Sequence, residues 1–97
     1  MLFTLQLKPI ADEEIVQAFL WYEEQRINLG EEFLQELDVY FELLKNSPAA
    51  FGKNETSEFH QVFMKRFPYV VVYDIHPGIV IIYSVHHTSR NPEDRIK

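Results

Sequence analysis

The chain has 97 residues, a net charge of −6 and no cysteine, and 46% of its residues are hydrophobic. This length predicts a single domain over residues 1–97, and the absence of cysteine excludes disulfides, thiolate metal sites and a cysteine nucleophile. The acidic total argues against direct binding of free DNA, because phosphates repel an acidic surface.

The first predicted element is a strand over residues 2–8, where apolar and polar side chains alternate. Phe3, Leu5 and Leu7 form its apolar side. Residues 1–14 contain neither a basic leader nor an apolar run long enough for a signal peptide or a membrane span. We therefore expect a soluble cytoplasmic protein that has no membrane partner.

A first helix is predicted to begin at Pro9, where the missing N–H of proline is harmless. The acidic residues 12–14 suit the positive end of the helix dipole. Gly30 is expected to end or follow this helix. The apolar face recurs near helical spacing and consists of Ile15, Ala18, Phe19, Tyr22 and Leu29.

A second helix is predicted from about Glu31 to Asn46, and Pro48 prevents it from continuing. Because the connection between the two helices is short, they should form an antiparallel hairpin. The buried stripe of the second helix comprises Phe33, Leu37, Tyr40, Phe41 and Leu44. The side expected to face water carries Glu32, Glu36 and Glu42.

Three strands are predicted next, over residues 59–66, 69–75 and 79–87. Pro77 and Gly78 predict a tight turn between the last two, because proline fixes its φ and glycine supplies a positive φ. These two strands are apolar on both faces, so at least one should be central. The order β-α-α-β-β-β predicts an α+β fold: a small, mainly antiparallel, twisted sheet with a helical hairpin packed on one face.

Positive charge gathers in the C-terminal part. Residues 1–58 hold 12 acidic and 4 basic residues, whereas residues 59–97 hold 3 acidic and 5 basic residues and every histidine. A cationic cluster is therefore predicted at the end of the sheet, made of Lys65, Arg66, His87 and Arg90, with His60, Arg95 and Lys97 close to it. Such a cluster could bind a partner or cleave a phosphodiester. Alternatively, these residues solubilise strand ends, and Arg90 pairs with Glu93 or Asp94.

The strong motifs of metal and cofactor enzymes are absent from the sequence. It has no phosphate-binding glycine loop, no HExxH and no GxSxG. His86 and His87 are adjacent, so on a strand their side chains point to opposite faces and cannot both bind one metal ion. We therefore predict neither a metal site nor a cofactor.

Four short stretches carry a resemblance. They are Trp21-Tyr22-Glu23, Leu29-Gly30-Glu31-Glu32-Phe33, Phe67-Pro68-Tyr69 followed by a valine run to Tyr73, and Val85-x-His87-x-x-Arg90-Asn91-Pro92. In residues, order and spacing the chain resembles the RelE/ParE superfamily of toxins from bacterial type II toxin–antitoxin systems, especially its ParE-like, plasmid-stabilisation branch. The predicted β-α-α-β-β-β order is also the fold of that family.

The resemblance implies two different activities. The family's ribosome-dependent ribonucleases hold the scissile phosphate with basic residues, whereas its ParE-like members poison DNA gyrase. In a ribonuclease, His87 would be the general base or acid, and Arg90 and Lys65 would stabilise the phosphorane charge. Three differences from the family's ribonucleases weaken the ribonuclease hypothesis. There is no C-terminal tyrosine, and His60-Gln61 stands where relatives often have an arginine. The chain is also acidic, whereas the ribonucleases are basic.

Three functions stay open at this point. The chain is a ParE-like toxin that binds a protein, DNA gyrase, and is neutralised by a cognate antitoxin; or a RelE-like endoribonuclease that cleaves mRNA at the ribosome; or a degenerate relative that only binds antitoxin. The antitoxin is expected to fold onto the groove between the helical hairpin and the sheet, or onto a sheet edge. The cationic C-terminal half should steer an acidic antitoxin tail, so we expect partner contacts at Lys65, Arg66, Arg90 and Arg95, with Trp21 or Leu20 as the apolar anchor.

Overall fold

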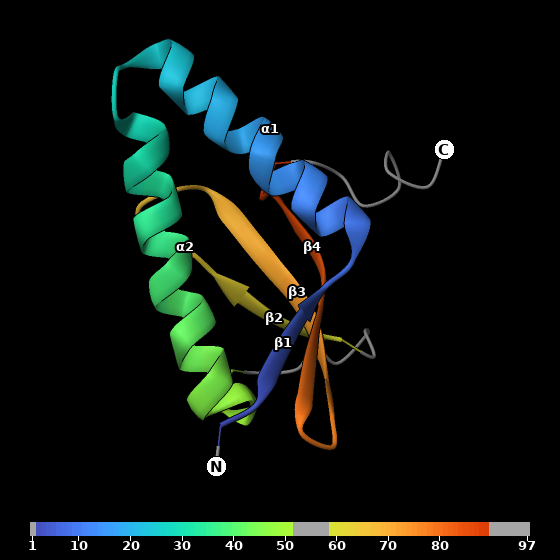
Figure 1. Ribbon diagram of the computed structural model, residues 1–97. Helices are drawn as coiled ribbons and strands as arrows, with labels where there is room; N and C mark the ends of the chain where they lie inside the picture. Colours follow the sequence, from blue (N-terminus) through green and yellow to red (C-terminus); the bar gives the residue numbers. More distant parts are fainter. Residues whose placement is uncertain (1, 52–58, 90–97) are drawn as a thin grey trace.

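The computed structural model of the chain describes residues 2–51 and 59–89. Its main elements are β1 (Thr4–Leu7), α1 (Pro9–Gln25), α2 (Leu29–Asn46), β2 (His60–Phe63), β3 (Tyr69–His76) and β4 (Ile79–His87). The strands form one sheet in the order β1-β4-β3-β2, in which β1 runs parallel to β4 and the other pairs are antiparallel. Both helices lie on one face of the sheet (Figure 1). The predicted α+β fold is confirmed.

The first strand and helix form where the sequence pattern predicts them. In β1, Leu5 and Leu7 pack against the core, while Thr4 and Gln6 are exposed. Pro9 occupies the first turn of α1, where its missing N–H costs nothing. Just before it, the N–H of Lys8 donates to Ile82 O at 2.9 Å. The chain thus leaves the sheet through one last bond to β4 and turns directly into the helix.

The second helix begins slightly earlier than predicted, at Leu29. Gly30, which we expected to end or follow the first helix, lies in the first turn of α2. A Cβ at this position would stand 2.6 Å from Phe19 O, so only glycine lets the two helices approach this closely. Asn28 makes the turn with a φ of 72°, a conformation in which asparagine is enriched. Leu29 therefore belongs to α2 and not to the apolar face of α1.

The two central strands are β3 and β4, as their apolar sequences predict. Pro77 and Gly78 join them, and the glycine has the predicted positive φ, of 74°. β2 is shorter than the strand predicted over residues 59–66, so Lys65 and Arg66 lie in the loop that leads to β3. The largest fully buried side chains of the core are Tyr73, Phe33, Leu44, Ile82, Val71, Val80 and Val85.

An extra residue in β4 decides which way the end of this strand faces. The pairing with β3 shifts between Val72 and Tyr73, which leaves Tyr83 without a partner on β3. A bulge of this kind moves the alternation of side chains by one residue. His87 consequently lies opposite Tyr69, on the side of the sheet that faces the helices. Unbroken alternation would have turned it away from them.

Candidate partner-binding site

Four aromatic rings pack together where the two helices meet the start of β3. We call this set the aromatic cluster; it consists of Tyr22, Phe33, Phe67 and Tyr69. Most of its ring pairs are edge to face, the arrangement that aromatic quadrupoles favour. Burial raises the pKa of Tyr22, and the neighbouring Tyr69 raises it further. Three of the four family-like stretches supply these rings, so those stretches hold α1, α2 and β3 together.

Glu23, in the first family-like stretch, joins the two helices by hydrogen bonds. Its carboxylate accepts from the backbone N–H groups of Asn28 and Glu31, at 3.3 and 3.2 Å. These donors at the start of α2 have no acceptor within their own helix, and a carboxylate also suits the helix dipole there. The sequence did not indicate this cap, because the acceptor comes from the preceding helix instead of from the residue before α2.

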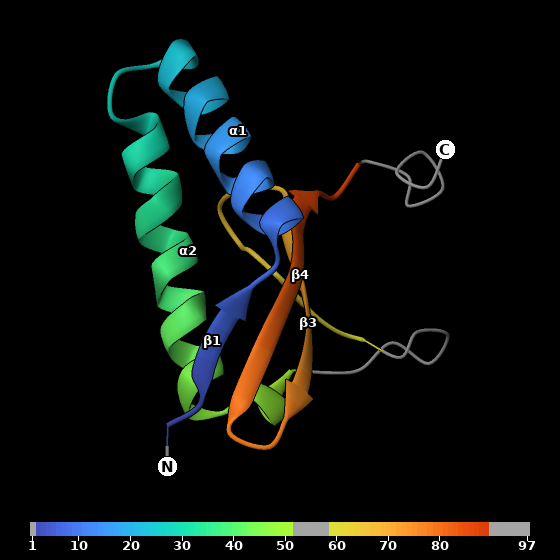
Figure 2. The same ribbon diagram turned by 45° about the vertical axis from the view of Figure 1, so that its right-hand side comes forward.

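A groove of about 1240 Å³ lies between α1 and the adjoining ends of β3 and β4, and we call it the α1–β4 groove. Figure 2 shows α1 beside the end of β4. From α1 the lining residues include Ile10, Glu13, Glu14, Gln17, Leu20, Trp21 and Glu24. From the sheet end they include Pro68, Tyr69, Val85, His86, His87 and Ser89. The groove therefore contains two predicted site residues, His87 and Trp21.

Helix α1 carries large apolar side chains on its groove side as well as on its core side. Its core side buries Ala18 and Tyr22 almost completely. At the groove, however, Ile10, Leu20 and Trp21 are 50, 49 and 54% exposed. Large apolar side chains that gather on an exposed surface often mark a site of contact with another protein. The exposed side of α1 thus has the composition of a surface that another chain covers.

The charged side chains of the α1–β4 groove are acidic. Glu13, Glu14 and Glu24 line it, and none of the described lining residues is lysine or arginine. Glu13 and Glu24 are exposed to solvent. The described lining therefore has the opposite sign to the cationic cluster that the sequence predicted at the end of the sheet.

Glu14 ties α1 to the open edge of β4. Because β1 pairs only with the first half of β4, the later N–H groups on that edge need another acceptor. Glu14 Oε1 accepts from Val85 N–H at 3.0 Å and from Ser84 Oγ at 2.8 Å. His86 Nδ1 lies 2.8 Å from Ser84 Oγ. Since the hydroxyl gives its only proton to the carboxylate, the imidazole must be the donor to Ser84.

His87 stands between the groove and the aromatic cluster. Its ring packs edge-on against Tyr69, with centroids 5.3 Å apart. The backbone N–H of Ser89 donates to His87 Nδ1 at 3.1 Å, and Ser89 Oγ lies 2.7 Å from the same nitrogen. Because a backbone N–H can only donate, Nδ1 carries a lone pair, and the proton of the neutral ring sits on Nε2. The ring is thus held in one orientation by its neighbours.

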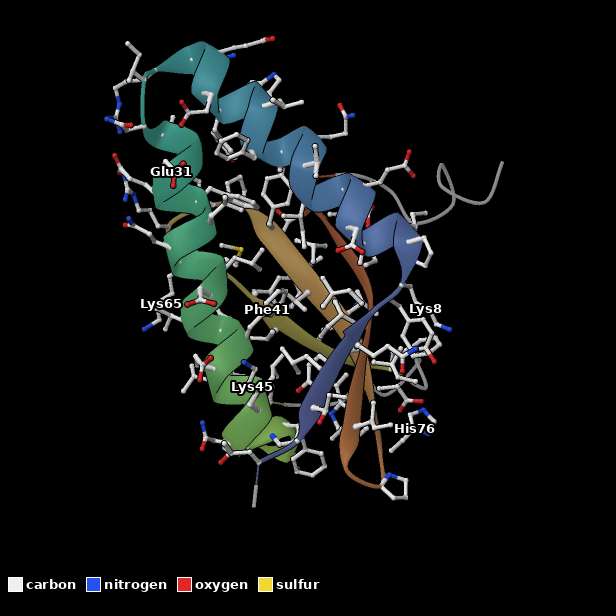
Figure 3. All side chains as sticks on the ribbon, in the orientation of Figure 1. Lys8, Glu31, Phe41, Lys45, Lys65 and His76 are labelled. Atoms are coloured by element: carbon white, nitrogen blue, oxygen red, sulfur yellow. The ribbon has the colours of Figure 1, made fainter. Side chains whose placement is uncertain are left out.

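Lys65 and Arg66 lie beside α2, away from the groove, and Figure 3 shows Lys65 next to the middle of that helix. The backbone N–H of Lys65 donates to Glu36 Oε2 and to Tyr40 Oη, both at 3.1 Å. The backbone N–H of Arg66 donates to the same Glu36 oxygen, also at 3.1 Å. Glu36, which we expected to face only water, therefore holds the loop between β2 and β3 against α2.

Glu32 is likewise engaged instead of simply facing water. It forms ion pairs with Arg66 and with Arg26, the second at 3.2 Å. The hydrogen bond from Arg66, together with Arg26, lowers the pKa of Glu32. The Arg66 guanidinium also lies 5.1 Å from the centroid of the Phe67 ring. The charge of Arg66 is thus directed at groups of its own chain.

The remaining predicted residues are not part of the groove. His60 opens β2, where its ring stacks on Tyr73 and its Nδ1 lies 3.2 Å from Phe51 O. Tyr73 donates to Pro48 O at 2.6 Å, and burial raises its pKa to about 12. The predicted Arg90 and Arg95, and Lys97 with them, lie outside the described residues.

Within the described part of the chain, the site residues fall into two groups. Trp21 and His87 line the α1–β4 groove, whereas Lys65 and Arg66 contact α2. The described residues include no group of three or more histidine, aspartate or glutamate side chains placed to hold a metal ion. None of the described helices is long and apolar enough to cross a membrane.

Known proteins share both the sequence pattern and the fold. The family model for the ParE toxin of type II toxin-antitoxin system, parDE, matches residues 5–92. Among solved structures, a chain of the chromosomal ParDE TA system from P. aeruginosa superposes with a TM-score of 0.76. The two chains are 11% identical, over 89% of this chain and 96% of that one, so this likeness shows a shared fold. No curated protein sequence matches the chain.

Proposed function

The chain belongs to the ParE toxin family of type II toxin–antitoxin systems, and we propose that it arrests bacterial growth by binding a protein target, DNA gyrase, until a cognate antitoxin neutralises it. The observation that carries this proposal is the composition of the α1–β4 groove. It exposes Trp21, Leu20 and Ile10 to solvent among carboxylates. Large apolar anchors beside polar groups are typical of surfaces that bind proteins.

The charge of the groove favours a protein target over RNA. Glu13 and Glu24 line the same groove as His87. RNA carries a phosphate at every nucleotide, so a surface that binds it needs lysine or arginine, and carboxylates repel it. A protein target imposes no such requirement.

The ribonuclease hypothesis finds less support among the described residues. Cleavage needs a proton-transferring group and phosphate-binding cations around one scissile bond. His87 lines the groove, but the backbone of Lys65 is held beside α2, outside that groove. Arg90, the third residue of that predicted site, is outside the described residues. We therefore rank this activity second.

Induction of the gene alone in a bacterium tests the toxin assignment. We expect growth to stop, and to resume when the cognate antitoxin is co-expressed. Normal growth at high soluble expression would instead favour a degenerate relative that retains only antitoxin binding.

The purified protein separates the two targets. We expect it to inhibit DNA supercoiling by gyrase and to leave mRNA intact in a translating extract. The opposite result would contradict the proposal: no effect on gyrase, together with ribosome-dependent cleavage of mRNA that disappears in His87→Ala.

A further inference from the structure

Two carboxylates of α1 stand on either side of Leu20 and Trp21 in the α1–β4 groove. Glu13 and Glu24 lie eleven residues apart on α1, which is about 16 Å along the helix axis. Between them the helix presents Gln17 and Trp21 to the groove. No ion pair among the described residues engages either carboxylate, and both are exposed. They are therefore available to a partner.

The described lysine and arginine near this end of the sheet lie beside α2, outside the groove. Arg66 pairs with Glu32, and the backbone of the Lys65–Arg66 loop is held by Glu36 beside α2. The described lining of the groove contains neither lysine nor arginine. An acidic segment that entered it would meet like charges, which costs affinity, whereas a basic segment would be steered in.

We propose that the α1–β4 groove binds an apolar segment of the antitoxin that carries two basic residues, one at each carboxylate. Its apolar side chains cover Trp21 and Leu20, and its lysine or arginine side chains pair with Glu13 and Glu24. In a helical segment the two bases are about eleven residues apart, and in an extended segment about five. This inference rests on the proposed function, because it specifies the antitoxin segment that occupies the groove.

A phage-displayed library of random peptides, selected on the full-length protein, tests this chemistry even when the sequence of the antitoxin is unknown. We expect the selected sequences to combine aliphatic or aromatic residues with lysine or arginine. A synthetic peptide of the selected sequence should bind less tightly as salt increases. It should also lose about tenfold or more in affinity for the double variant Glu13→Lys, Glu24→Lys, because two attractions become repulsions.

A matched control makes the same change of charge outside the groove. In the double variant Glu31→Lys, Asp38→Lys, two exposed acidic residues of α2 are reversed, and affinity should change by less than about threefold. Trp21→Ala should weaken binding in parallel with the groove variant. The inference is overturned by selection of acidic sequences, by equal effects of the two double variants, or by the absence of any selected binder.

The peptide selection and the growth experiment test different claims, and either claim can be contradicted without the other. A protein that stops growth but selects acidic peptides overturns only the basic-segment inference. A protein that selects basic peptides in the groove but never stops growth overturns only the proposed toxin activity.

Discussion

The two sides of the helical hairpin differ in whether their groups find partners within the chain. Beside α2, Glu36 accepts hydrogen bonds from the backbone N–H groups of Lys65 and Arg66. Phe67 of the same loop belongs to the aromatic cluster. Beside α1, Trp21 is 54% exposed in a groove lined by carboxylates. The loop beside α2 is thus held by the chain itself, whereas the groove beside α1 has the composition of half an interface.

This difference shows that the position of a lysine or arginine in the fold, more than its residue type, decides whether its charge is available to a partner. Lysine and arginine near a sheet end suggested a partner-binding surface, yet Arg66 pairs with Glu32 of its own chain. The apolar side chains of α1 gave a weaker signal in the sequence, yet they line one side of the α1–β4 groove. Substitutions on the α2 side should therefore reduce stability, and substitutions in the groove should reduce partner binding.

The largest loss of stability is expected from Phe33→Ala. Phe33 is fully buried and contacts three other rings of the aromatic cluster. Its truncation should lower the free energy of unfolding by about 3–5 kcal/mol in urea denaturation. Phe63→Ala is the matched control, because Phe63 is 57% exposed and its loss should cost less than about 1 kcal/mol. Equal losses for both variants would contradict the role of the cluster.

The second largest loss of stability is expected from Gly30→Ala. Helix propensity alone predicts a gain of about 1 kcal/mol. The added Cβ would, however, lie 2.6 Å from Phe19 O and 2.7 Å from Glu23 Cγ, so the two helices must move apart. We expect a net loss of about 1–3 kcal/mol, measured by thermal or urea unfolding. A variant as stable as the parent, or more stable, would show that the helices do not need this contact.

Glu36→Ala should have a smaller effect. It removes the acceptor of two backbone N–H groups in the exposed loop between β2 and β3. By analogy with the loss of a helix cap, unfolding should become easier by about 1 kcal/mol. Hydrogen exchange of the Lys65 and Arg66 amides should accelerate. Glu31→Ala, at an exposed position of the same helix, should leave that exchange unchanged. Faster exchange in both variants would show that Glu36 does not specifically hold the loop.

The smallest effect concerns acid stability and Glu32. Its pKa is lowered in the folded chain from the ordinary 4.5, first by the hydrogen bond from Arg66. The stabilisation from this ion pair is therefore present above about pH 4.5 and is lost as the pH falls through the lower folded value. In Glu32→Gln, stability should depend less on pH in that window, and added salt should reduce the difference between the two proteins. If the pH dependence of stability at low pH were the same in Glu32→Gln as in the parent, this ion pair would not contribute to stability.

Local signals in the sequence predict most of the fold. Alternation predicts β1, Pro9 marks the start of α1, and Pro77 with Gly78 predicts the turn between the central strands. The position of Gly30 was not predictable in this way. Glycine is required there because Phe19 O of the other helix approaches the position of a Cβ, and no local pattern reveals this contact.

The candidate site was less predictable, because it depends on contacts between distant segments. Lys65 and Arg66 looked close to the groove from their sequence positions, but Glu36 of α2, about thirty positions earlier, binds the backbone of their loop. The Arg66 side chain pairs with Glu32 of the same helix. The direction of His87 depends on the bulge at Tyr83, which exists only through pairing with β3. Trp21 was predicted as an anchor because it was left over from the apolar face of its helix, and it does line the groove.

Trp21 offers the most direct test that the α1–β4 groove is the docking surface, because it is the only tryptophan of the chain and is 54% exposed. Its fluorescence therefore reports on the groove alone. When the cognate antitoxin binds, the emission should shift to shorter wavelength and quenching by acrylamide should fall. A complex that forms by size-exclusion chromatography while the emission and the quenching of Trp21 stay unchanged would place the partner elsewhere and contradict the account.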